Sequence, residues 1–172
     1  MLEIDTHRLC LIALGLPQLR TLALYGQATM EAQLGWRLSG QQLDADAQLA
    51  ARELYALAQH HPNQIAFYTS WQVVLRQKQV CIGGARFKGA PDAFGEVELG
   101  YGLYASHRGC GYMREAARAL CDWALLQPGV CSVIAYTDVD NVSSQHVLQY
   151  SGMQRVKRID DGLLWRRSKE GA

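Results

Sequence analysis

The 172-residue sequence lacks the features that mark several large classes of protein. It contains no block of basic residues and has a formal net charge of only +1. Because binding to a phosphate backbone needs clustered Lys and Arg, we expect no nucleic-acid partner. No apolar run reaches the length of a membrane-spanning helix, and the N-terminus MLEIDTHRL has no apolar signal-peptide region. We therefore expect a cytoplasmic protein with no membrane partner.

Paired cysteines are also missing. The sequence has five cysteines and no Cys-x-x-Cys pair, which argues against a disulfide framework and against a zinc site, so no metal is expected. Cys110 lies in a glycine turn, where no neighbouring sequence supplies a base that would activate a nucleophile. A small residue in a tight turn is the simpler interpretation. The other four lie in apolar stretches and are expected in the core: Cys10, Cys81, Cys121 and Cys131.

Hydrophobic residues make up 49% of the chain, enough for a substantial core in a single domain spanning residues 1–172. The three strands in the middle have short polar connections and predict an antiparallel meander, and the later strand–helix–strand order predicts a parallel crossover. The predicted fold class is α+β with a mostly antiparallel sheet. The expected elements are strands at 2–14, 71–76, 80–87, 96–104, 130–137, 153–158 and 163–167, and helices from Pro17, near 30–34, at 42–60, from Met113 and at 142–151.

A glycine turn, Arg108–Met113, separates the strand at 96–104 from the helix that follows it. Such a turn places free backbone N–H groups at the positive end of the helix dipole, where a phosphate group binds well. The spacing does not fit a dinucleotide-binding fingerprint, and no Gly-Lys-Ser or Gly-Lys-Thr of a P-loop is present. We interpret the turn as the site for the pyrophosphate of a nucleotide-type cofactor.

The strand at 96–104 carries two carboxylates followed by two glycines on one face: Glu96, Glu98, Gly100 and Gly102. Glycine weakens a strand unless something must approach the backbone closely, so one interpretation places a ligand over the glycines with a carboxylate beside it. The alternative is the solvated face of an edge strand. Glu98 is nearer the glycines and is the candidate general base. Glu96 is either a second binding carboxylate or simply solvated.

Asn141 and Ser144 lie between the crossover strand and the next helix. Both residue types cap helices routinely, and this is the simpler interpretation of the pair. The alternative is that they also form hydrogen bonds with a ligand between the two strand ends.

Three blocks of the sequence together resemble the GNAT superfamily of acetyl-CoA-dependent N-acetyltransferases, most closely its ribosomal-protein N-terminal acetyltransferase branch. The opening, Asp5-Thr6-His7-Arg8-Leu9-Cys10-Leu11, is similar to that branch's Thr-x-Arg-Leu-x-Leu. The centre, from Glu98-Leu99-Gly100-Tyr101 through the glycine turn to Glu115-Ala116, is similar to its glutamate–Gly-Tyr strand and Arg-Gly-x-Gly-Tyr turn. The last block is Asn141-x-x-Ser144 followed by Gly152-Met153.

The resemblance implies a splayed sheet with helices on both faces and acetyl-CoA bound between the crossover strands. It implies that an amine, deprotonated with help from Glu98, attacks the thioester directly. Two departures stand out: Met113 replaces the usual Gly or Ala, and Leu148 takes the position of the family's frequent tyrosine acid, with Tyr150 pointing elsewhere. The implied cofactor contacts are Leu103 and Tyr104 through the backbone, Arg108, Gly109, Cys110, Gly111, Tyr112 and Met113 around the pyrophosphate, and Asn141 and Ser144 from the last helix.

Other functions stay open at this stage. A non-catalytic acyl-CoA-binding or sensory module on the same fold is the main alternative, and a purely partner-binding domain is the third. The acceptor amine is equally open between a peptide N-terminus, a polyamine and a small metabolite. The expected assembly is a monomer or a homodimer.

Overall fold

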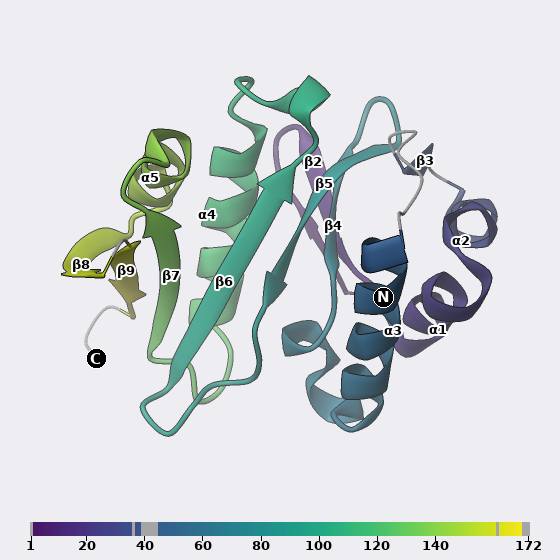
Figure 1. Ribbon diagram of the computed structural model, residues 1–172, viewed down its shortest axis with the longest axis horizontal. Helices are drawn as coiled ribbons and strands as arrows, with labels where there is room; N and C mark the ends of the chain where they lie inside the picture. The colour runs from purple at the N-terminus through teal and green to yellow at the C-terminus, as the bar shows by residue number, and fades with distance from the viewer. Residues whose placement is uncertain (1, 36, 39–44, 161, 170–172) are drawn as a thin grey trace.

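A computed structural model describes residues 2–35, 37–38, 45–160 and 162–169 (Figure 1). Its centre is one mixed sheet with the strand order β1-β2-β4-β5-β6-β7-β9-β8, and β3 pairs with β5. The strands are β1 (Leu2–Asp5), β2 (Leu9–Ala13), β3 (Arg37–Leu38), β4 (Trp71–Leu75), β5 (Val80–Phe87), β6 (Glu96–Leu103), β7 (Ser132–Asp138), β8 (Gln154–Ile159) and β9 (Gly162–Ser168). The α-helices are α1 (Leu16–Tyr25), α2 (Gln27–Leu34), α3 (Ala45–Gln59), α4 (Tyr112–Leu125) and α5 (Val142–Tyr150), and short 3₁₀ helices cover Pro62–Phe67 (η1) and Ala105–His107 (η2).

The pairing of β6 with β7 is short. The two strands are parallel and pair only from Glu96 opposite Ser132 to Glu98 opposite Ile134. Beyond that point they diverge, and Figure 1 shows β6 and β7 adjacent at the bottom of the view and apart at the top. The other pairs are antiparallel apart from β3 with β5, which confirms the predicted α+β class with its antiparallel meander and parallel crossover.

Helices cover both faces of the sheet. On one face, α4 packs its apolar stripe against the strands, with Ala117, Leu120 and Cys121 completely buried. On the other face, Leu19 of α1, Met30 of α2 and Ala58 of α3 form a second core with β2, β4 and β5. Every residue of β4 is buried because this strand has a helical layer on each side. Burial on both faces explains why its sequence is apolar almost throughout.

The N-terminal strand is not continuous, which corrects the expectation of one strand over 2–14. β1 and β2 instead form an antiparallel hairpin. The Thr6 backbone N–H donates to the Leu9 carbonyl at 2.9 Å, and the Thr6 hydroxyl oxygen accepts from the Leu9 N–H at 3.0 Å, so Thr6 closes a tight turn that apolar periodicity does not reveal. The short elements β3 and η1 were also not expected, and residues 42–44 of the expected helix at 42–60 lie outside the described part.

The cysteines divide between core and surface. Cys81 and Cys121 are buried as expected, Cys10 is half-buried, and Cys131 is exposed, which corrects the expectation that all four would be core residues. Cys131 lies in the connection just before β7 begins at Ser132, so its side chain is not covered by the sheet.

Candidate cofactor site and catalytic face

The glycine turn forms a cup of backbone N–H groups at the start of α4. Gly109 and Gly111 have φ values of +79° and +75°, in the left-handed region that glycine enters without strain. Within the residues that the structure describes, the N–H groups of 109–114 donate to no other protein group; the first bond into the helix comes from the Glu115 N–H to the Gly111 carbonyl, at 3.3 Å. Successive free N–H groups at a helix N-terminus make an anion-binding concavity.

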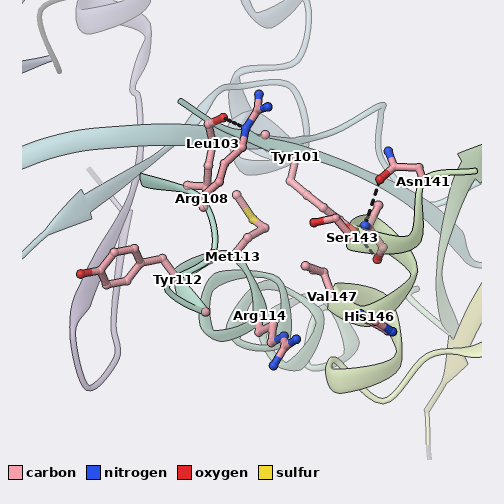
Figure 2. A pocket seen from close by; sticks show the side chains of 14 residues that line it. Tyr101, Leu103, Arg108, Tyr112, Met113, Arg114, Asn141, Ser143, His146 and Val147 are labelled. Atoms are coloured by element: carbon pink, nitrogen blue, oxygen red, sulfur yellow. Dashed lines mark hydrogen bonds between the residues drawn. The ribbon is translucent and has the colours of Figure 1, made fainter. Parts of the chain in front are cut away.

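The cup opens into a cavity of about 410 Å³ between the end of β6 and α5 (Figure 2). Three elements build its wall: the end of β6, the turn with the first residues of α4, and the N-terminal half of α5. The Arg108 Nε donates to the Leu103 carbonyl at 3.0 Å and so joins the turn to the end of β6. The residues that line the cavity are Tyr101, Gly102, Leu103, Arg108, Gly109, Gly111, Tyr112, Met113, Arg114, Asn141, Ser143, Ser144, His146 and Val147.

Tyr101 and Ser144 bridge β6 and α5 across the cavity. The Tyr101 hydroxyl is 2.8 Å from the Ser144 Oγ and donates to the Ser144 carbonyl at 3.2 Å. Burial raises the pKa of Tyr101 to about 12, against a smaller lowering by the bond to Ser144. The phenol therefore stays protonated at neutral pH and acts as a hydrogen-bond donor.

Asn141 caps α5, as its sequence position predicts. Its side-chain oxygen accepts from the Ser144 N–H at 3.0 Å. Both residues also line the cavity, so the capping interpretation and the ligand interpretation are compatible.

The backbone groups of Leu103 and Tyr104 point to opposite edges of β6. The Tyr104 N–H donates to Ile82 on β5 at 2.9 Å, and its carbonyl accepts from the His107 N–H at 2.9 Å. Because backbone groups alternate between the two edges of a strand, Leu103 directs its own N–H and C=O to the opposite edge, where β7 has diverged. The Leu103 carbonyl already accepts from the Arg108 Nε, so the expected backbone contact fits the Leu103 N–H, whereas both backbone groups of Tyr104 have partners.

Most of the expected cofactor residues come together at this cavity, and Tyr104 and Cys110 are the exceptions. The Cys110 side chain is exposed, outside the lining. The sequence signal for Tyr101 was its place on the same strand face as Leu103, and the signal for Val147 was its position one helical turn after Ser144. Gly102, one of the two glycines over which a ligand was expected, also lines the cavity. The lining residues that were not expected are Tyr101, Arg114, Ser143, His146 and Val147.

The bulky Met113 has a structural explanation. Its side chain is only 6% exposed and belongs to the core between α4 and the sheet, while its edge also lines the cavity.

Leu148 is completely buried, and Tyr150 is 54% exposed and borders a separate depression beside the β1–β2 turn. Tyr150 is thus away from the cavity, in agreement with the helical geometry of the sequence.

Glu98 lies on the face of β6 opposite α4. Its carboxylate forms an ion pair with Lys88, the first residue of the connection between β5 and β6. Glu96 lies on the same face, where it accepts from the Ser132 hydroxyl at 3.1 Å and pairs with Arg166 at 2.7 Å.

β6 is a central strand between β5 and β7, so the edge-strand alternative is wrong. A Cβ added at Gly100 or Gly102 would meet no atom within 4 Å, which leaves open space beside Glu98 on this face.

The fold and this site define the class of the protein. The family described as "Acetyltransferase (GNAT) domain" matches residues 8–154, and the chain belongs to this family. Its members are acetyltransferases that bind acetyl-CoA.

Individual relatives agree with this assignment. The chain is 30% identical over 152 residues to the uncharacterized N-acetyltransferase YjdG of Bacillus subtilis (strain 168), covering 88% of this chain and 89% of the relative. Its fold is similar to that of the ribosomal-protein-S5-alanine acetyltransferase of Vibrio fischeri, with a TM-score of 0.71, 18% identity, and 99% and 98% of the two chains covered. It is also similar to RimL, a ribosomal L7/L12 α-N-protein acetyltransferase solved with coenzyme A, with a TM-score of 0.71, 16% identity, and 99% and 100% covered.

Membrane-spanning helices and metal-binding clusters are both absent from the part of the chain that the structure describes. No helix there is both long and apolar enough to cross a membrane. Among the same residues, no group of His, Cys, Asp and Glu side chains is arranged to hold a metal ion.

Proposed function

We propose that this protein transfers an acetyl group from acetyl-CoA to a primary amine. The observation that carries the proposal is the cup of unpaired N–H groups at 109–114, among the described residues, which opens into the cavity between the end of β6 and α5. The cup suits the pyrophosphate, because N–H groups and the helix dipole both favour negative charge there. Arg108 and Arg114 add positive charge at the cavity wall.

The pantetheine arm is proposed to lie along the free edge of β6. Tyr101 and Leu103 direct their backbone groups to this edge, where an extended amide-bearing chain can take the place of the missing strand. Asn141 and Ser144, at the start of α5, line the opposite side of the cavity. The cavity therefore supplies polar partners along its length and an apolar floor at Met113 and Val147.

When bound, acetyl-CoA supplies an activated thioester carbonyl at the point where the strands diverge. Glu98 is proposed to accept the proton of the attacking amine, directly or through water. The Lys88 ammonium forms an ion pair with this carboxylate on the open face of β6. Free N–H groups of β6 beyond Glu98 are proposed to stabilise the negative charge that develops on the carbonyl oxygen.

Substitution of Glu98 tests the catalytic assignment. Glu98→Gln keeps the shape of the side chain but cannot accept the proton, so we expect kcat to fall about 10²-fold or more while the Kd for acetyl-CoA changes little. Glu96→Gln is the matched control, on the same strand and face, and should retain most of the turnover. Equal loss of turnover and cofactor affinity in Glu98→Gln, or no loss, would contradict the general-base role.

The acceptor is best identified by an assay of thiol release from acetyl-CoA. Two structural neighbours are named for acetylating ribosomal proteins, so peptide N-termini belong in the panel with polyamines and small amines. The alternative, a non-catalytic acyl-CoA-binding or sensory module, predicts tight binding of acetyl-CoA without amine-dependent thiol release.

A further inference from the structure

The turn between β1 and β2, residues 6–8, lies against the start of α4. We propose that Thr6, Arg8 and Glu115 form a clamp that aims the N–H groups of the glycine turn and thereby sets the affinity for the cofactor. This inference rests on the proposed function. These are positioning residues, because Thr6, Arg8 and Glu115 do not line the cavity between the end of β6 and α5.

The first half of the clamp is the Glu115 carboxylate, in the first turn of α4. Its Oε1 accepts from the Thr6 hydroxyl at 2.6 Å and from the Arg8 backbone N–H at 2.7 Å. Its Oε2 accepts from the Arg8 Nε at 2.7 Å. Both carboxylate oxygens are thus engaged by one turn that lies more than 100 positions away, with sequence separations of 107 and 109.

The second half of the clamp reaches the glycine turn itself. The Arg8 Nη1 donates to the Cys110 carbonyl at 3.0 Å. The guanidinium also lies over the Tyr112 ring, 4.6 Å from its centroid. Arg8 therefore holds residues on each side of Gly111.

The geometry of the peptide group connects these contacts to the cofactor. In a trans peptide, the carbonyl of one residue and the N–H of the next point in opposite directions. Drawing the Cys110 carbonyl toward Arg8 therefore turns the Gly111 N–H the other way. Gly111 borders both the cavity and the depression beside Arg8, and its N–H points away from Arg8. We therefore infer that this N–H faces the proposed pyrophosphate position and that the Cys110 carbonyl dipole is kept away from the anion.

Replacement of Arg8 should affect binding more than folding. Arg8 is partly exposed, and exposed ion pairs contribute little to the free energy of unfolding. A ligand that finds its donors already oriented avoids the entropy cost of ordering them. Loss of the clamp should therefore weaken the interaction with the pyrophosphate specifically.

Arg8→Lys is the critical variant. Lysine keeps the positive charge beside Glu115, but one ammonium group cannot reproduce the two-armed contact with Glu115 and Cys110. We expect the Kd and KM for acetyl-CoA to rise about tenfold with kcat nearly unchanged, as for misplacement of a binding group. With S-acetylpantetheine, which lacks the pyrophosphate, kcat/KM should match that of the wild type.

Arg167→Lys is the matched control. Arg167 is also a two-armed arginine attached to α4, through Asp122, and it donates to the Ser151 carbonyl at 2.9 Å. It does not contact the glycine turn, so its substitution should leave acetyl-CoA affinity unchanged. A second clamp variant, Thr6→Val, should weaken acetyl-CoA binding in the same direction as Arg8→Lys.

The outcomes separate the two proposals. If the wild type binds acetyl-CoA and Arg8→Lys binds it equally well, or loses activity toward both thioesters alike, the clamp is wrong and the proposed function stands. If the wild type binds no acetyl-CoA, the proposed function fails, and the clamp's role in cofactor binding fails with it.

Discussion

At the scale of single residues, the backbone conformation of Gly111 constrains the glycine turn. Its φ of +75° disfavours any other residue. An added Cβ would lie 3.6 Å from the Arg8 Nη2, an ordinary van der Waals contact, so the constraint comes from the backbone alone. Gly111 is also the residue whose N–H the Arg8 contact orients.

Gly111→Ala should lower the free energy of unfolding by about 1–2 kcal/mol, because a side chain in the left-handed region is strained. Relaxation of that strain would also tilt the N–H groups of the cup, so affinity for acetyl-CoA should fall. Urea unfolding and ligand titration measure the two effects. Gly100→Ala is the control, since its φ is not in the left-handed region and its Cβ would meet open space. Equal stability of the two variants would contradict the strain argument.

At the scale of elements, the β1–β2 turn and the start of α4 are joined through Glu115. Burial raises the pKa of this carboxyl, but the hydrogen bonds from Thr6 and Arg8 and the charge of Arg8 outweigh burial and lower the pKa below its usual 4.5. A carboxyl whose pKa is lower in the folded state stabilises the fold above its unfolded pKa. That contribution is lost as the pH falls through the folded pKa.

Glu115→Gln should therefore be less stable than the wild type at pH 7, and the difference should shrink as the pH falls below about 4.5. Protonated Glu115 and glutamine are both neutral, so the two proteins converge in acid. Urea unfolding of both proteins between pH 7 and pH 3 measures this difference. If the two free energies of unfolding differed by the same amount over this whole range, the charge of the Glu115 carboxylate would not contribute to the contact between the β1–β2 turn and α4.

At the scale of the whole molecule, the site depends on the point where the sheet opens. α4 and α5 line one side of the opening, whereas Glu98 lies on the other face, so the cofactor and the acceptor amine would approach from different directions. A ligand in the opening would contact both β6 and α5. These two elements are also joined by the hydrogen bond between the Tyr101 and Ser144 side chains.

Acetyl-CoA should therefore stabilise the whole domain. At 100 times its Kd, a ligand that binds only the folded state adds about 2.7 kcal/mol to the free energy of unfolding. Thermal unfolding at increasing acetyl-CoA concentration measures the effect, with pantetheine as the control that lacks the pyrophosphate and should give a smaller shift. A melting temperature independent of acetyl-CoA would contradict cofactor binding.

The local parts of the site could be predicted from the sequence. The glycine turn, the Asn141 cap and the buried stripe of α4 depend on residues close together in the chain, whose periodicity and backbone preferences are visible in the sequence. Tyr104 could not be separated from Leu103 in this way, because the edge to which each backbone points depends on which strand lies beside it.

The sequence by itself determined a glycine turn before a buried helix, a meander, and a parallel crossover. Only the tertiary structure decided where β6 and β7 part, which residues reach the opening, and that Thr6 and Arg8 hold Glu115. The physical reason is distance along the chain. Turn conformation and helix capping arise from neighbouring residues, whereas strand divergence and a contact between residues 107 positions apart arise only when the packed core brings distant segments together.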